Sequence, residues 1–238
     1  MTHRRCGIVI LHGKWGKPPF AHAPLGAALA EAGHQVASPT LPWALRRLYD
    51  RDFTTALDEI EGEMAHLRQQ GCDRVVLAGH SLGACAALAY AAQRGNLDGL
   101  ALLAPAHFPA RLAVEGFTTA SLATAREALV GATPERRIPV VDVNQGQRHR
   151  LRVAPAYYLS YFDPAGPTDW AANARRLPAT LPVLWAVGRD DPAFGRQMDY
   201  AFHLTPAHGR RVHVELEADH GGTPEAAAPW LIRWLADL

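Results

Sequence analysis

The sequence predicts an α/β fold in which a mostly parallel sheet of about six strands is flanked by helices. Two observations support this fold class: short apolar runs alternate with longer helical patterns, and no internal repeat or low-complexity linker divides the chain. A length of 238 residues suits one sizeable domain and is short for two. We therefore expect a single domain over residues 1–238.

Six runs of strand length are expected to form the sheet: Ile8–Leu11, Gln35–Ser38, Val75–Ala78, Leu100–Leu103, Val183–Val187 and Val212–Leu216. Four segments have the apolar spacing of helices: Leu25–Ala32, Thr54–Gln70, Leu82–Arg94 and Pro224–Leu238. Glycines at positions 33 and 71 follow the first two helices and are typical of helix ends. The last helix is amphipathic, as a helix that packs on one face of a sheet should be.

Residues 107–177 interrupt this alternation. Aromatic side chains gather in the segment, at Tyr157, Tyr158, Tyr161, Phe162 and Trp170. A segment of this length without clear strand–helix alternation is usually functional, so one interpretation is a cap- or lid-like insertion within the domain. The other interpretation is a set of ordinary crossover helices with weak patterning.

Composition excludes several classes of protein. A formal charge of +1, with 20% charged residues, indicates neither a nucleic-acid partner nor an acidic one. Three scattered cysteines, Cys6, Cys72 and Cys85, do not make a disulfide framework or a zinc site. We expect no cofactor, no metal and no membrane span, and nothing in the sequence predicts an oligomeric state. The first apolar run is too short for a signal peptide, so we expect a cytoplasmic protein.

Residues 79–83, GHSLG, match the pattern G-x-S-x-G between a predicted strand and a predicted helix. A side chain presented on such a sharp turn needs a strained backbone, and the flanking residues approach so closely that a Cβ would clash. The helix that follows directs its unpaired N–H groups toward the site where negative charge develops during acyl transfer. The pattern predicts that Ser81 is a nucleophile. The alternative is a merely structural turn.

A serine nucleophile needs a base, and the base needs a partner that orients it. The fifth predicted strand runs into GRDDP and the sixth into EADHGG, so a carboxylate and a histidine follow the serine in the chain. Because parallel strands place their carboxyl ends at one edge of the sheet, all three side chains are expected to meet there.

With these motifs the chain resembles the α/β-hydrolase superfamily from Ile8 to the final helix, and in particular its small, esterase-like bacterial serine hydrolases that lack the first strands. The resemblance implies the catalytic acid three residues after a glycine, a spacing that Gly188 and Asp191 match. Asp191 is therefore preferred to Asp190. His220, before a glycine, corresponds to the histidine of the superfamily. The expected triad is Ser81, Asp191 and His220.

The resemblance also implies an oxyanion hole made by two main-chain N–H groups. One belongs to Leu82, which follows the nucleophile, and the other to Lys14 in the LHGKWG stretch of residues 11–16, with Trp15 as the alternate. Lys14 is expected to act through its main chain, with its charge incidental. His12 is expected to be a buried structural imidazole.

The superfamily most often acts on carboxylic esters, so the resemblance implies an esterase for small to medium ester substrates. Candidate substrate contacts are Trp15, Tyr157, Tyr158, Tyr161 and Phe162. Anchoring of a helix to the core is an equally good interpretation of the tyrosines and Phe162. The basic stretch at Arg148, Arg150 and Arg152 keeps an acyl thioesterase as an alternative, although a solvated surface is its default interpretation. A non-catalytic binding module on the same fold is the alternative from a different class.

Overall fold

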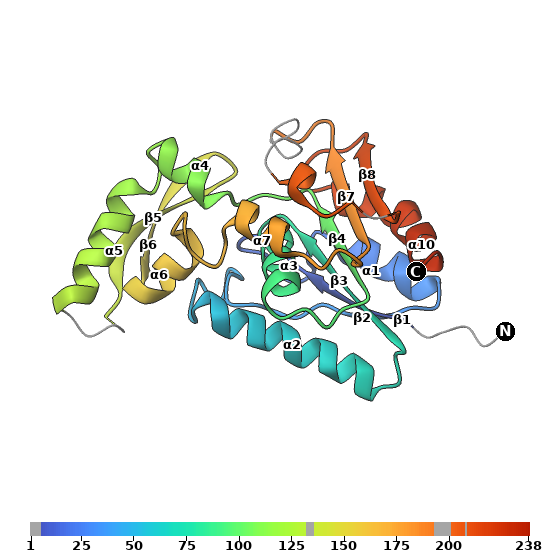
Figure 1. Cartoon of the computed structure of the whole chain (residues 1–238). Coiled ribbons are helices and arrows are strands. Elements are labelled where there is room, and N and C mark those ends of the chain that lie inside the picture. Colours follow the sequence, from blue (N-terminus) through green and yellow to red (C-terminus); the bar gives the residue numbers. More distant parts are fainter. Residues whose placement is uncertain (1–5, 132–135, 193–200, 208) are drawn as a thin grey trace.

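Six parallel strands form the central sheet in the order β2-β1-β3-β4-β7-β8 (Figure 1). The computed structural model describes residues 6–131, 136–192, 201–207 and 209–238. The strands are β1 (Cys6–Leu11), β2 (Gln35–Ala37), β3 (Arg74–His80), β4 (Gly99–Leu103), β7 (Val183–Gly188) and β8 (Arg211–Leu216). The four central strands are buried almost throughout, as expected of a sheet covered on both faces. The predicted α/β fold is confirmed.

Helices cover both faces of this sheet. On one face α2 (Phe53–Gln69), α3 (Leu82–Gln93) and α7 (Trp170–Arg176) share one apolar cluster with the sheet. On the other face α1 (Ala23–Glu31), α9 (Thr223–Ala226) and α10 (Ala228–Ala236) share a second cluster (Figure 1). No helix in the described ranges has the length and apolar character needed to cross a membrane.

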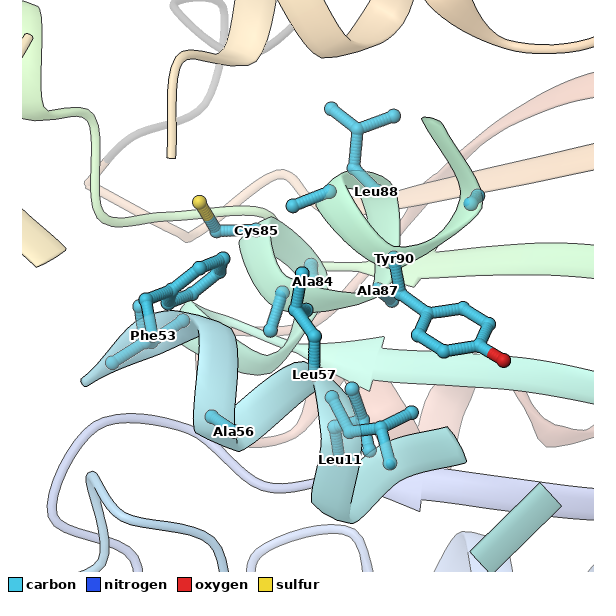
Figure 2. Close-up of a cluster of buried hydrophobic side chains, with 14 of the residues drawn as sticks. Leu11, Phe53, Ala56, Leu57, Ala84, Cys85, Ala87, Leu88 and Tyr90 are labelled. Carbon is cyan, nitrogen blue, oxygen red and sulfur yellow. The ribbon is translucent and has the colours of Figure 1, made fainter. Parts of the chain in front are cut away.

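Helix α3 is the most deeply buried helix of the first layer, with every residue from Leu82 to Ala91 buried. Its alanines are small enough for the helix to lie close to the sheet, while Leu57 and Phe53 of α2 pack against it from outside (Figure 2). Such packing leaves the helix no room to shift. The residue at its N-terminus is therefore held firmly in place.

The predicted C-terminal helix is interrupted. Two helices, α9 and α10, meet at Ala227, where the sequence predicts one. Pro229 explains the break, because proline has no N–H to donate and its ring clashes with the preceding turn of a continuous helix. A proline in the first turn of a new helix meets neither problem.

The segment between β4 and β7 contains α4 (Pro109–Val114), α5 (Thr119–Gly131), β5 (Ile138–Asn144), β6 (Gln147–Val153), α6 (Pro155–Phe162) and α7. Strands β5 and β6 pair antiparallel in a small sheet of their own. In Figure 1 the elements α4, α5, α6 and the hairpin lie to one side of the central sheet, whereas α7 packs on α3 as an ordinary crossover helix does. The segment thus contains a crossover helix on the sheet and a group of elements beside the sheet.

The β5–β6 hairpin was not among the predicted elements. Its two-residue turn, Gln145–Gly146, has positive φ at both positions, the geometry of a type I′ turn. Along β6 exposed arginines alternate with His149, Leu151 and Val153, which are partly or wholly buried. This period of two is a strand signal, although the same residues were expected only to form a basic stretch.

Candidate active site

Ser81 occupies the turn between β3 and α3, with φ 58° and ψ −119°. Non-glycine residues rarely adopt a positive φ, and such strain persists only where the surroundings enforce it. A Cβ on Gly79 would lie 2.2 Å from the oxygen of Gly83, and a Cβ on Gly83 would lie 2.4 Å from the oxygen of Leu11. Both distances are too short for real atoms. The two glycines are thus steric requirements of the turn that presents the serine.

The other two predicted residues lie at the carboxyl ends of β7 and β8. His220 Nδ1 is 2.6 Å from Asp191 Oδ2, and His220 Nε2 is 2.9 Å from Ser81 Oγ. The Asp191 side chain is 3% exposed and that of His220 is 30% exposed. The structure therefore brings Ser81, His220 and Asp191 together in one hydrogen-bonded chain, open to solvent at the histidine.

The carboxylate of Asp191 fixes the tautomer of the histidine. An ionised carboxylate only accepts hydrogen bonds, so Nδ1 of His220 carries the proton and Nε2 accepts from the Ser81 hydroxyl. Asp190 is exposed, and its main-chain N–H donates to the oxygen of Ala218. Of the two neighbouring aspartates, Asp191 is the one that contacts the histidine.

His80, the residue before the nucleophile, belongs to the site although it was not among the predicted site residues. Its Nε2 lies 2.9 Å from the main-chain oxygen of His220, and the two rings are 5.0 Å apart between centroids. Burial is the main cause, and the nearby His220 the second, that lowers the pKa of His80 to about 3. A neutral His80 therefore donates from Nε2 to that oxygen and ties the histidine loop to the nucleophile turn.

Residues 12–16, which we call the HGKWG loop, pass beside the serine. A Cβ on Gly13 would lie 3.1 Å from Ser81 Cβ. The Trp15 N–H donates to the oxygen of Trp43 at 2.8 Å, so it is not available to an oxyanion. Within the described ranges no acceptor binds the main-chain N–H of Lys14 or of Leu82. Of the two alternatives in the loop, Lys14 fits an oxyanion donor and Trp15 does not.

The ring of His12 stabilises this loop through hydrogen bonds and stacking. Its Nδ1 donates to the oxygen of Gly13 at 2.8 Å, its Nε2 accepts from the Leu41 N–H at 3.1 Å, and its ring stacks on Phe20. Burial is the main reason that the pKa of His12 falls to about 4. These contacts use both ring nitrogens, which agrees with the expected structural role.

The side chain of Lys14 corrects one expectation. Its charge is not incidental, because Nζ donates to Asp142 Oδ1 at 2.6 Å and to the oxygen of Val143 at 2.8 Å. The Lys14 and Asp142 side chains are 6% and 0% exposed. The partner is in the β5–β6 hairpin, far away in the sequence, so no local pattern pointed to it.

Most of the aromatic side chains of α6 are buried, which favours anchoring of the helix over substrate contact. Tyr158, Tyr161 and Phe162 are fully buried, which makes them core residues that anchor α6 rather than exposed substrate contacts. Three rings surround Tyr161 edge-on, those of Trp43, Tyr49 and Phe53. Tyr157 and Trp15 are partly exposed and remain candidates for contact with a substrate.

Arg148, Arg150 and Arg152 are exposed along β6. Successive side chains of a strand point to opposite faces, and the ring of His149 lies 4.7 Å from that of Trp15 in the HGKWG loop. The arginines therefore point away from this loop. Their position supports a solvated surface and gives no support to recognition of an anionic substrate at the serine.

The cysteines of the chain show no reactive character. Cys6, Cys72 and Cys85 are all buried. Burial raises the pKa of the Cys6 thiol to about 11 and raises that of Cys85 as well, so both stay protonated at neutral pH. In the described part of the chain no group of three or more His, Cys, Asp or Glu residues is arranged to hold a metal ion.

The parallel sheet, the serine on a glycine-flanked turn and the histidine–carboxylate pair at the same edge define a class of protein. The chain belongs to the Alpha/beta hydrolase family, whose sequence model matches residues 8–233. The superfamily resemblance is thus confirmed. No curated protein is significantly similar to the chain in sequence.

Solved structures with this fold include several enzymes at low identity. Est1E from Butyrivibrio proteoclasticus is 17% identical, with a TM-score of 0.65 over 99% of this chain and 90% of that one. The monoacylglycerol lipase of Paleococcus ferrophilus is 19% identical, with a TM-score of 0.65 over 96% and 94%. The thioesterase domain of the curacin biosynthetic pathway is 18% identical, with a TM-score of 0.60 over 97% and 91%. At these identities the likeness shows the fold alone.

Proposed function

We propose that the chain is a carboxylesterase that cleaves small to medium carboxylic esters through an acyl-enzyme on Ser81. The observation that carries this proposal is the pair of hydrogen bonds from Ser81 through His220 to Asp191. A serine becomes a nucleophile when a base takes its proton and a third group orients that base. A serine in a merely structural turn needs neither partner. The fold likeness to a lipase and to an esterase domain supports esters as the substrate class.

In the first half-reaction Ser81 Oγ attacks the ester carbonyl carbon while His220 Nε2 takes the hydroxyl proton. The main-chain N–H groups of Leu82 and Lys14 would stabilise the tetrahedral oxyanion. One such donor is worth about 10²–10³ in rate. Collapse of this intermediate breaks the bond to the alkoxide, which leaves as the alcohol after His220 returns the proton. The acyl group then remains on Ser81.

In the second half-reaction water releases the acyl group. His220 Nε2 accepts a proton from the attacking water, whose oxygen bonds to the acyl carbon and forms a second tetrahedral intermediate. Collapse of that intermediate breaks the bond to Ser81, and the proton on His220 passes to the serine oxygen. The products are a carboxylic acid and an alcohol. Asp191 stays ionised throughout and stabilises the imidazolium form of His220.

We further propose that residues 107–177 act as a cap within the single domain and bound the space for the substrate. The β5–β6 hairpin supports this role, because its residues contact the HGKWG loop beside Ser81. Tyr157 and Trp15, both partly exposed, are the side chains that we assign to substrate contact. The size of the acyl group that the enzyme prefers would then depend on the cap.

The thioesterase alternative now has less support, because the arginines that suggested it point away from the HGKWG loop. What remains in its favour is the fold likeness to a thioesterase domain. A non-catalytic binding module also has little support, because binding alone would not require Ser81 to be hydrogen-bonded to a histidine that is itself bonded to a buried aspartate.

The test is hydrolysis of p-nitrophenyl esters from acetate to palmitate, beside acyl-CoA thioesters, by the wild type and Ser81→Ala. We expect turnover of short or medium esters and a loss in kcat of at least about 10⁴ in the variant. Turnover of thioesters alone would favour the thioesterase. Absence of both turnover and labelling of Ser81 by a fluorophosphonate would contradict the catalytic proposal and favour a binding module.

A further inference from the structure

We infer that one cross-strand pair of the β5–β6 hairpin, Asp142 and His149, positions the HGKWG loop for catalysis. Asp142 contacts Lys14 of the loop, and His149 contacts Trp15. The inference rests on the proposed function, since it concerns the oxyanion donor of that same site. It makes Asp142 a positioning residue, which acts on the reaction through Lys14 without touching the substrate.

The first contact is a buried ion pair between the loop and the hairpin. Lys14 Nζ donates to Asp142 Oδ1 at 2.6 Å and to the oxygen of Val143 at 2.8 Å, and it lies 5.2 Å from the centre of the Phe162 ring. Both charged side chains are almost wholly removed from water. Loss of either partner would leave the other as a buried, uncompensated charge. The ion pair therefore fixes Lys14 to the hairpin.

The carboxylate of Asp142 is itself held from both sides. Its Oδ2 accepts from the Tyr49 hydroxyl at 2.6 Å, and its Oδ1 also accepts from the Val143 N–H at 2.6 Å. Burial is the main cause that raises the pKa of Tyr49 well above its ordinary value, so the hydroxyl remains a donor. A carboxylate with bonds on each oxygen has little freedom to move. Lys14 is thus anchored to a fixed point.

The second contact fixes the next residue of the loop. The Trp15 ring meets the His149 ring edge-on at 4.7 Å, and His149 lies opposite Asp142 in the hairpin. On its other side the loop is bonded to residues 43–45 by the Trp15 N–H, and by the oxygen of Gly16, which accepts from the Leu45 N–H at 3.1 Å. The loop is therefore clamped between the hairpin and residues 43–45.

The clamp explains how the loop keeps a strained backbone. Trp15 has φ 53°, a value that a bulky residue adopts only when its surroundings enforce it. An oxyanion donor must lie about 2.7–3.1 Å from the developing charge, and a displacement of about 1 Å at a catalytic group costs about 10² in rate. Withdrawal of the hairpin would take Lys14 with it. The hairpin is thus part of the catalytic framework and not a detachable lid.

The test compares Lys14→Met, Asp142→Asn and the double variant, with kcat, KM and the thermal midpoint Tm measured for each. We expect each single variant to lose about 10² in kcat with KM changed less than about threefold, because oxyanion contacts form mainly in the transition state. Each also loses stability through its unpaired buried partner. The double variant removes both charges, so it regains most of the lost Tm while kcat stays low.

The matched control is Arg126→Met, which removes the ion pair of Arg126 in α5 with Asp163, the residue that follows α6. This pair is more exposed and does not reach the HGKWG loop, so we expect kcat to change less than about twofold. Recovery of kcat together with Tm in the double variant would overturn the inference, since the pair would then serve stability alone. A tenfold or greater loss of kcat in Arg126→Met would also overturn the inference.

A milder variant keeps the inference testable if the charge variants do not fold. Tyr49→Phe removes one hydrogen bond from Asp142 and leaves both charges, and we expect about a fivefold loss in kcat with KM unchanged. An unchanged kcat in this variant would count against the inference. Failure of the proposed function looks different, because the wild type would then neither hydrolyse esters nor react with a fluorophosphonate.

Discussion

Two neighbouring aspartates show how much one residue position decides at this site. Asp191 is buried and contacts His220, whereas Asp190 beside it is exposed and contributes a main-chain N–H to another loop. The spacing from a glycine favoured Asp191 in the sequence. Contact with the histidine gives that preference a physical basis, because a carboxylate orients an imidazole only from hydrogen-bond distance.

We expect Asp191→Asn to lower kcat by about 10⁴, because an amide at this position no longer enforces the tautomer in which Nε2 is free to accept the serine proton. Asp190→Asn makes the same chemical change one residue earlier, at an exposed side chain, and should stay within about twofold of the wild type. Steady-state kinetics with the best p-nitrophenyl ester distinguishes them. Equal losses in the two variants would contradict the assignment of the acid.

Single residues also show where sequence reasoning stops. The order of serine, aspartate and histidine was predictable, because each follows a strand of a sheet whose edge they share. The partner of Lys14 was not predictable, since Asp142 lies in an element that was itself missed. His80 was not predicted for a similar reason, because its contact is with a main-chain oxygen that no side-chain pattern reports.

At the scale of elements, two glycines in helices differ in whether a larger side chain would fit. Gly62 lies on the exposed side of α2, where an added Cβ would meet no described atom within 4 Å. Gly83 lies in the first turn of α3, where the same atom would lie 2.4 Å from the oxygen of Leu11 and 2.7 Å from that of His12. Helix propensity favours alanine at both positions, and sterics oppose it at only one.

We therefore expect Gly62→Ala to raise the free energy of unfolding by about 0.5–1 kcal/mol, through propensity alone. Gly83→Ala should lower it by about 3 kcal/mol or more, because main-chain atoms of β1 and of the HGKWG loop must move. Urea unfolding followed by circular dichroism measures both changes. A stabilising Gly83→Ala would show that α3 does not approach β1 as closely as described.

The elements that sequence reasoning predicted are those with strong periodic signals. All six strands of the central sheet were expected within a few residues of where they lie, since buried parallel strands form unbroken apolar runs. The same holds for helices α1, α2 and α3, whereas the 13-residue helix α5 was not predicted. The β5–β6 hairpin was missed because the arginines at every second position of β6 were interpreted as a basic stretch and not as the polar half of an alternating strand pattern. The break at Ala227 was missed because an amphipathic pattern continues across it, and only Pro229 marks the boundary.

At the scale of the whole molecule, buried histidines link stability to pH. Burial is the largest cause that lowers the pKa of His12 and His22 to about 4 and that of His80 to about 3. In the unfolded chain these groups titrate near the ordinary value of about 6.5. Below that pH the unfolded chain binds protons that the folded chain does not. Stability therefore falls as the pH drops from about 6.5 toward 4.

We expect each of these histidines to add a slope of up to about 1.4 kcal/mol per pH unit within that window. Urea unfolding at several pH values between 7 and 4 measures the slope. His22→Gln keeps a donor for the Ser38 hydroxyl, which the His22 ring contacts at 3.2 Å. We expect this variant to lose the contribution of one histidine to the slope of stability against pH. Identical slopes in the variant and the wild type would contradict the linkage.

The strand order of the sheet has a consequence for how the chain becomes active. Strands β1 to β4 come from the first part of the chain and carry Ser81, whereas β7 and β8, which lead into Asp191 and His220, join the sheet only after the long segment that follows β4. Closing so long a loop costs chain entropy and slows the pairing of β4 with β7. A nascent chain thus holds its nucleophile without a base until the last strands dock, and reactivity arises together with the completed fold.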